Sequence, residues 1–124
     1  MVKTFPNLGL LIFRVLISGM MLFHGIPKIE KLFTLPISFA DPLGVGSTTS
    51  LILTLIGEVL APIFIIIGFK TRWAPIPAAI TMAVAAFIVH TDDSFYKKEK
   101  AILYLICFVA IGLLGPGKYA INKK

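Results

Sequence analysis

The chain has 124 residues, of which 57% are hydrophobic and 15% are charged, and its mean hydropathy is +0.93. Soluble domains average about 45–50% apolar and about 25% charged residues, so this composition excludes an ordinary soluble enzyme and indicates a membrane protein. The formal net charge is +6, but the basic residues lie at the ends of apolar runs, where Lys and Arg anchor helices at lipid headgroups. We therefore expect a lipid bilayer as the partner and no nucleic acid.

Four apolar segments each approach the ~20 residues that cross a ~30 Å hydrocarbon layer. We expect membrane helices over residues 8–26, 50–69, 73–90 and 94–115. Candidate N-caps precede the second helix at residues 47–50 and the fourth at Asp92 and Asp93. Pro75 and Pro77 fit the first turn of the third helix.

The connection over residues 31–46 is too apolar for a free loop and too broken by Pro and Gly for a membrane span. We expect it to form an interfacial or re-entrant cap. The tight connection at residues 68–72 makes the second and third helices antiparallel neighbours. The predicted fold is therefore all-α: an integral membrane four-helix bundle with up-down-up-down topology, in one domain over residues 1–124.

Basic residues set the expected orientation in the membrane. Six Lys and Arg residues fall on the side that holds both termini and five on the opposite side. The positive-inside rule then places both termini in the cytoplasm, with the chain in a prokaryotic cytoplasmic membrane. Cys107 is the only cysteine, so there is no internal disulfide or CxxC redox pair. Any electron transfer must therefore use a bound cofactor or another subunit.

Arg14 and Glu58 each lie inside a long apolar run. An unpaired ion at the centre of a membrane helix costs about 2.5–3.5 kcal/mol, so the two charges are expected to form a pair or to face a protected polar cavity. As a pair they would hold the first two helices in register. As catalytic candidates, Glu58 would accept or relay a proton, while Arg14 would orient Glu58 or contact a ligand.

The sequence around Glu58 also predicts a local irregularity. Pro62 lies four residues later and has no N–H to donate to the Glu58 carbonyl. Thr54, one turn earlier, can offer its hydroxyl to the carboxyl group, and Gly57 and Ala61 form a small-xxx-small pair that permits close helix approach. These features indicate a kinked helix beside a polar cavity.

A second set of polar residues is expected at the opposite side of the membrane from the termini. His24 and Lys28 lie one turn apart at the end of the first helix, His90 ends the third, and Glu99 opens the fourth. They are candidates for binding the oxygens of a quinone. Their spacing matches no specific metal site, so no metal is predicted. The alternative is that the histidines bond to headgroups or loops.

The chain resembles the DoxX family of small four-helix membrane proteins over residues 8–118. The ordered set of matching residues is Arg14, His24, Gly25, Lys28, Gly57, Glu58, Gly68, Phe69, Lys70, Thr71, Arg72, His90, Glu99, Gly115, Pro116 and Gly117. The family is named with the small subunits of archaeal thiosulfate:quinone oxidoreductase. Other members are linked to membrane assemblies that handle reactive oxygen and sulfur, and distant relatives look like cargo receptors or receptor chaperones.

The resemblance implies a membrane subunit of a quinone-linked oxidoreductase system, related to sulfur or reactive oxygen, that binds a quinone-like ligand. We expect a subunit rather than a self-sufficient enzyme, acting with a protein partner or as a homo-oligomer. The alternative is a non-enzymatic membrane assembly factor, chaperone or partner-binding protein. A small-molecule carrier is a third possibility, because a polar line that reaches mid-membrane also suits a permeation path.

Overall fold

The computed structural model describes residues 4–34, 39, 41–89 and 94–120. Within these ranges the chain is helical and contains no strand, which confirms the all-α prediction. The described residues form four helical rods, some of them composite. They are α1 (Pro6–Ile29) with a 3₁₀ turn η1 (Glu30–Leu32); α2 (Ser47–Leu55), a π-helical turn η2 (Ile56–Leu60) and α3 (Ala61–Ile67); α4 (Pro75–Val84) with a second π-helical turn η3 (Ala85–Val89); and α5 (Phe95–Leu114).

Prolines and glycines set several of the helix ends. α1 begins at Pro6 and α4 begins at Pro75, because proline has the backbone angle of a first helical turn and its missing N–H would be unpaired there. α3 ends at Gly68, whose φ of 76° is left-handed. The second rod begins at Ser47, directly after Gly46, and has no side-chain cap, so the expected capping there is wrong. The expected caps Asp92 and Asp93 lie outside the described residues.

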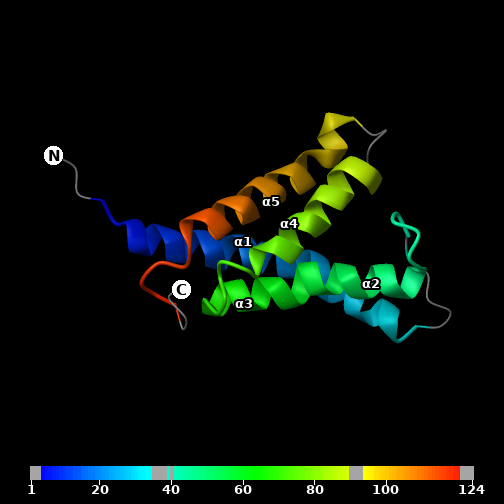
Figure 1. Cartoon of the computed structure of the whole chain (residues 1–124), viewed down its shortest axis with the longest axis horizontal. Helices are drawn as coiled ribbons and strands as arrows, with labels where there is room; N and C mark the ends of the chain where they lie inside the picture. Colours follow the sequence, from blue (N-terminus) through cyan, green and yellow to red (C-terminus); the bar gives the residue numbers. More distant parts are fainter. Residues whose placement is uncertain (1–3, 35–38, 40, 90–93, 121–124) are drawn as a thin grey trace.

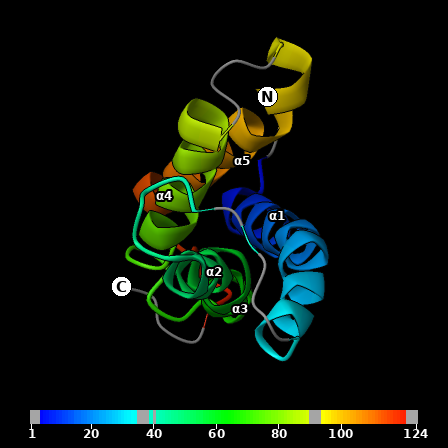
Figure 2. The ribbon, with the colours of Figure 1, turned by 90° about the vertical axis from the view of Figure 1, so that its right-hand side faces the viewer.

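The rods pack in two pairs. The rod α2–η2–α3 lies along α1, and α4 lies along α5 (Figure 1). The start of α1, the turn between α3 and α4, and the end of α5 lie at one end of the molecule, whereas η1 and the start of α2 lie at the other. Seen nearly along the long axis, α1, α2, α4 and α5 surround a common centre (Figure 2). The buried core residues there are Met21, Ala61, Ile65, Ala74, Ala78, Met82, Tyr104, Phe108 and Ile111.

The outward face of α1 is more apolar than its buried face. Its buried residues are Arg14, Ser18, Met21 and Gly25, and its exposed apolar residues include Leu8, Ile12, Leu16, Met20 and Phe23. Lipid imposes no penalty on exposed apolar side chains, and helices in membranes pack through small and polar residues. This inverted pattern is therefore that of a helix surrounded by lipid.

Within the described residues, two helices are long and apolar enough to cross a membrane, Pro6–Leu32 and Ser47–Ile67. Residues Pro75–Ile88 form a shorter apolar helix. α5 carries charged residues in its first turns, which leaves an apolar stretch over residues 101–114 of about 21 Å at 1.5 Å per residue.

Two glycines allow η2 to pack tightly between its neighbours. A Cβ on Gly25 of α1 would lie 2.5 Å from the backbone oxygen of Glu58. A Cβ on Gly57 would overlap Thr81 Oγ1 and would lie 2.9 Å from the Pro77 carbonyl of α4. The close approach predicted at Gly57 is thus confirmed, and both α1 and α4 pack closely against the second rod at η2.

The irregular turn itself follows from Pro62. Proline cannot donate a hydrogen bond to the Glu58 carbonyl, and the N–H of Ala61 bonds to Ile56 O, five residues back. The result is one π-helical turn that contains Glu58. The sequence predicted an irregularity at this position, and the structure gives it this form.

Candidate functional site

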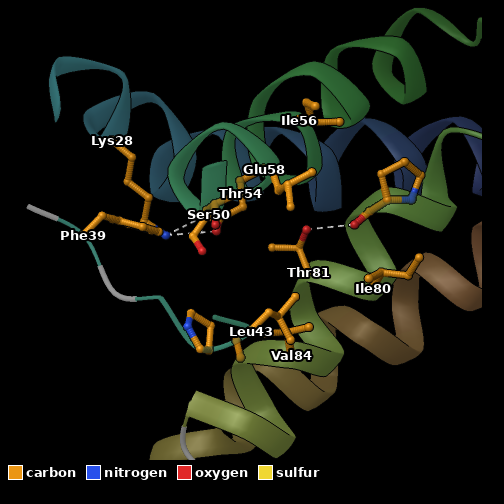
Figure 3. A pocket seen from close by; sticks show the side chains of 14 residues that line it. Lys28, Phe39, Leu43, Ser50, Thr54, Ile56, Glu58, Ile80, Thr81 and Val84 are labelled. Atoms are coloured by element: carbon orange, nitrogen blue, oxygen red, sulfur yellow. Dashed lines mark hydrogen bonds and ion pairs between the residues drawn. The ribbon is translucent and has the colours of Figure 1, made fainter. Parts of the chain in front are cut away.

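A pocket of about 490 Å³ opens beside η2 (Figure 3). α1, the second rod, the third rod and the first connection all contribute to its walls. Its lining residues are Lys28, Phe39, Pro42, Leu43, Ser50, Leu53, Thr54, Ile56, Glu58, Pro77, Ile80, Thr81, Val84 and Ala85. Ligand pockets in proteins are typically about 300–1,000 Å³ and mostly apolar, with a few placed polar groups. This pocket has that size and composition.

The two charged side chains in the pocket wall, Lys28 and Glu58, form an ion pair. Lys28 Nζ lies 2.8 Å from Glu58 Oε1 and 2.9 Å from Oε2. The Glu58 side chain is 5% exposed and that of Lys28 is 31% exposed. Lys28 is in the last turn of α1, and its long side chain reaches Glu58 in η2 (Figure 3). The predicted Arg14–Glu58 pair is therefore wrong, because Lys28 holds both carboxylate oxygens.

Arg14 binds backbone carbonyls instead. Its Nε donates to Pro116 O at 3.2 Å, and its Nη1 donates to Ile65 O at 3.0 Å and to Ile66 O. The last carbonyls of a helix have no partner within the helix and carry the negative end of its dipole. Arg14, 2% exposed, neutralises this end of α3 and ties the segment after α5 to it.

Arg14 and Glu58 do not meet because they lie at different heights along the molecule. Arg14 lies level with the end of α3, whereas Lys28 lies level with η2. These two residues of α1 are about 21 Å apart along the helix axis. The sequence shows only that both charges lie within apolar runs and not that they differ in height, and Arg14 does not line the pocket.

Three hydroxyl groups line the pocket with different hydrogen-bonding states. Thr81 Oγ1 donates to Pro77 O at 2.8 Å, and Ser50 Oγ donates to Asp41 Oδ1 at 2.8 Å. The Thr54 hydroxyl makes no hydrogen bond with a described residue, so the expected bond to the Glu58 carboxylate is absent there. Its hydroxyl is available to a ligand.

Asp41 organises the described part of the first connection. Its carboxylate accepts hydrogen bonds from Ser50 Oγ, from Val45 N at 2.9 Å and from Gly46 N at 2.8 Å. The bond from Ser50, followed by the backbone bonds, lowers the pKa of Asp41. The neighbouring Pro42 and Leu43 line the pocket. This stretch thus covers one end of it.

The other predicted site residues that the structure describes, His24 and Glu99, are absent from the pocket lining. His24 packs edge-on against Tyr104, with ring centroids 5.7 Å apart, and Lys100, Glu58 and Lys28 are close enough to interact with it electrostatically. Glu99 is half-buried on α5. His90 lies outside the described residues. Among the residues that are described, no three His, Cys, Asp or Glu side chains gather as a metal would require.

Sequence reasoning missed Asp41 and Thr81. Asp41 carries the signal of an aspartate shortly before two glycines and a serine, which is typical of a turn closed by a side-chain carboxylate. Thr81 carries a weaker signal, a threonine four residues after Pro77 in an apolar helix. The pocket is also flanked by both π-helical turns, since Glu58 belongs to η2 and Ala85 to η3. Such turns occur frequently at functional sites.

Comparison with known proteins gives a family match and a relative. A family model described as DoxX matches residues 9–91, a range that spans α1 to η3 and therefore the pocket. An uncharacterized protein of Haemophilus influenzae is 27% identical over 118 residues, which cover 90% of this chain and 86% of the relative. No solved structure matches the chain.

Proposed function

We propose that this chain, which belongs to the DoxX family of membrane proteins, binds a small quinone-like molecule as the membrane subunit of a quinone-linked oxidoreductase system. The match over residues 9–91 confirms the family resemblance read from the sequence. We assign sulfur or reactive-oxygen chemistry to the system as a whole, with a protein partner or a second copy of this chain supplying what one pocket lacks.

In this proposal residues 1–124 form one transmembrane domain. Its four rods cross the bilayer in alternating directions as an antiparallel bundle, with both termini in the cytoplasm of a prokaryotic cell. The first connection then lies at the opposite surface as an interfacial cap. Support comes from the two candidate spans and from the apolar outward face of α1.

The observation that carries the proposal is an ion pair in the wall of a mostly apolar pocket. A quinone has an apolar body and carbonyl oxygens that need hydrogen-bond donors. Lys28 has three donor hydrogens, of which two are directed at the Glu58 oxygens. The third can bond to a quinone oxygen, while Glu58 relays the protons that a quinone gains on reduction or accepts those that a quinol releases on oxidation.

The other predicted site residues take revised or supporting roles. Arg14 positions α1 against α3 and does not contact the ligand, since its donors are directed at backbone carbonyls. His24 lies near the ion pair, and Glu99 and His90 remain proposed for the mouth of the pocket. The partner supplies the electrons, since one cysteine offers no redox pair.

The test is mass spectrometry of the organic extract from protein purified in mild detergent. Wild type and Glu58→Gln are compared, with Gly19→Ala as the control because a Cβ at Gly19 meets nothing within 4 Å. We expect a near-stoichiometric quinone in wild type and in the control, and its depletion from a folded Glu58→Gln. Equal quinone in all three samples, or none in any, would refute the assignment.

A second candidate function is the assembly of other membrane proteins. A groove of about 440 Å³ on the outer side of α4 and α5 supports it, with the small residues Ala79 and Gly112 in its lining. Small residues let a helix of another protein approach closely. If this function holds, Gly112→Leu releases a co-purifying partner and leaves any bound quinone in place, whereas Glu58→Gln has no effect on the partner.

A further inference from the structure

We infer that the pocket receives its ligand sideways from the bilayer, between α2–η2 and α4, and that this ligand is uncharged and lipid-soluble with a carbonyl-type hydrogen-bond acceptor. The inference rests on the proposed function for the site, and it adds the route of entry and the chemical class of the ligand.

The rim of the pocket is apolar and exposed on helices that are candidates for crossing the membrane. Leu53 and Ile56 of the second rod are 47% and 37% exposed, and Ile80 of α4 is 58% exposed. All three also line the pocket, and Figure 3 shows Ile56 and Ile80 on the two helices that flank it. Ile56 lies about 14 Å along its rod from Ser47, the first residue of the candidate span Ser47–Ile67, and so within a ~30 Å hydrocarbon layer. At that depth the surrounding medium is lipid.

The end of the pocket nearest the membrane surface is covered. Phe39, Pro42 and Leu43 of the first connection line it there. Asp41 holds this segment to the start of α2 through its bond with Ser50 and two backbone N–H groups. The pocket is therefore closed toward water by an apolar segment that Asp41 holds in place, and it is open toward lipid at its rim.

Hydrogen-bonding capacity defines the polar part of the ligand. The hydroxyls of Ser50 and Thr81 already donate to Asp41 and to Pro77 O, so each can only accept a further bond. Among the described residues the available donors are the third hydrogen of Lys28 and the hydroxyl of Thr54. Both suit an acceptor oxygen on the ligand.

Charge defines the rest of the ligand class. Lys28 and Glu58 sum to zero, so the pocket offers no net attraction to an ion, and an ion would lose its hydration on entering from lipid. An inorganic sulfur oxyanion such as thiosulfate is therefore excluded as its occupant. A neutral quinone satisfies the donors and enters from the bilayer.

The route is tested by nitroxide accessibility, which does not depend on the identity of the ligand. A spin label is attached at Thr54→Cys in a Cys107→Ala background, in vesicles. Leu16→Cys, 59% exposed on α1, is the lipid control, and Thr48→Cys, exposed at the start of α2, is the water control. We expect the Thr54 label to collide with oxygen as often as the Leu16 label and rarely with a water-soluble nickel chelate. Nickel accessibility equal to that of the Thr48 label would overturn lateral entry.

The ligand class is tested with decylubiquinone as the probe. A bulky Ile80→Trp should slow its exchange between vesicles and protein several-fold, whereas Leu16→Trp on the far face should not. Thiosulfate in excess should displace none of it. Exchange that Ile80→Trp leaves unchanged would refute the lateral route, and displacement by thiosulfate would refute the ligand class. If wild type binds no decylubiquinone while the Thr54 label remains lipid-accessible, the proposed function fails and the route stands.

Discussion

Arg14 and Glu58 are both buried charges in apolar helices, with 2% and 4% of their surface exposed, yet their surroundings differ. The Arg14 guanidinium is surrounded by backbone carbonyls from the end of α3 and from the turn after α5. The Glu58 carboxylate is paired with one side chain, Lys28, beside an open pocket of about 490 Å³.

This difference separates a structural charge from a site. Helix-end carbonyls need a donor wherever they are buried, so Arg14 satisfies a requirement of the fold, and its donors are directed at backbone carbonyls. The Lys28–Glu58 pair leaves a donor and an adjacent volume unfilled. A buried charge in a membrane helix is therefore evidence of a binding site only when its partners leave room beside it.

The largest effect should come from Arg14→Met, which removes a donor from three carbonyl groups. Among the described residues, this leaves the carbonyls of Ile66 and Pro116 unpaired, while the Ile65 carbonyl keeps the N–H of Gly68. Buried polar groups without partners cost about 1–3 kcal/mol each, so we expect the free energy of unfolding to fall by about 3–5 kcal/mol. Denaturation in mixed detergent micelles measures it. Arg14→Lys, which keeps one charged donor, should recover part of the loss.

Arg14→Met also tests whether the charges of Arg14 and Glu58 interact with each other. Because Arg14 and Glu58 share no contact, adding Glu58→Leu to Arg14→Met should give the sum of the two single effects. If Glu58→Leu instead restored the stability of Arg14→Met, the two residues would be a pair and the comparison drawn above would be wrong.

A smaller effect is expected from Lys28→Met, which leaves the Glu58 carboxylate without its partner. Breaking a fully buried ion pair costs about 3–5 kcal/mol of stability. Because Lys28 is 31% exposed, we expect the free energy of unfolding to fall by about 2 kcal/mol. Lys28→Met/Glu58→Leu should regain that stability and still lose the quinone. A double variant as unstable as the sum of the singles would contradict a direct pair.

Gly25→Ala tests the packing that shapes the pocket. The new Cβ would lie 2.5 Å from the Glu58 backbone oxygen, which forces α1 and η2 apart. Overpacking of this kind costs about 1–2 kcal/mol. The matched control in the same helix is Gly19→Ala, which should be neutral or should stabilise by up to about 1 kcal/mol through helix propensity. Equal stability of the two variants would refute the close approach.

The smallest effect concerns the cover over the pocket. The pKa of Asp41 is lowered, chiefly by its bond with Ser50. The ionised Asp41 carboxylate therefore stabilises the cover at pH values above the ordinary carboxyl pKa of about 4. This stabilisation is lost as the pH falls below that value and the carboxylate is protonated. A nitroxide at Val45→Cys should become more mobile on acidification, and Asp41→Asn should be mobile at neutral pH with no further change in acid. A label equally immobile in all conditions would contradict the tether.

The sequence predicted the helices well because apolar runs and helix-start prolines are local signals. Pro75 began a helix as expected, and Pro62 disturbed the helix at Glu58. The partner of Arg14 could not be predicted in this way, since carbonyl acceptors are present at every residue and carry no sequence signal. The pocket could not be predicted from the sequence either, because it depends on how the second rod, α4 and the segment around Asp41 are arranged in space.

The central claim is that the Lys28–Glu58 end of the molecule binds the ligand and the Arg14 end only holds the fold. It is tested most directly by measuring decylubiquinone bound per protein in nanodiscs. The folded variants Lys28→Met/Glu58→Leu and Arg14→Lys are compared with wild type. We predict that Arg14→Lys retains the wild-type amount and that the double variant retains none. Loss of binding in Arg14→Lys with binding preserved in the double variant would contradict the account.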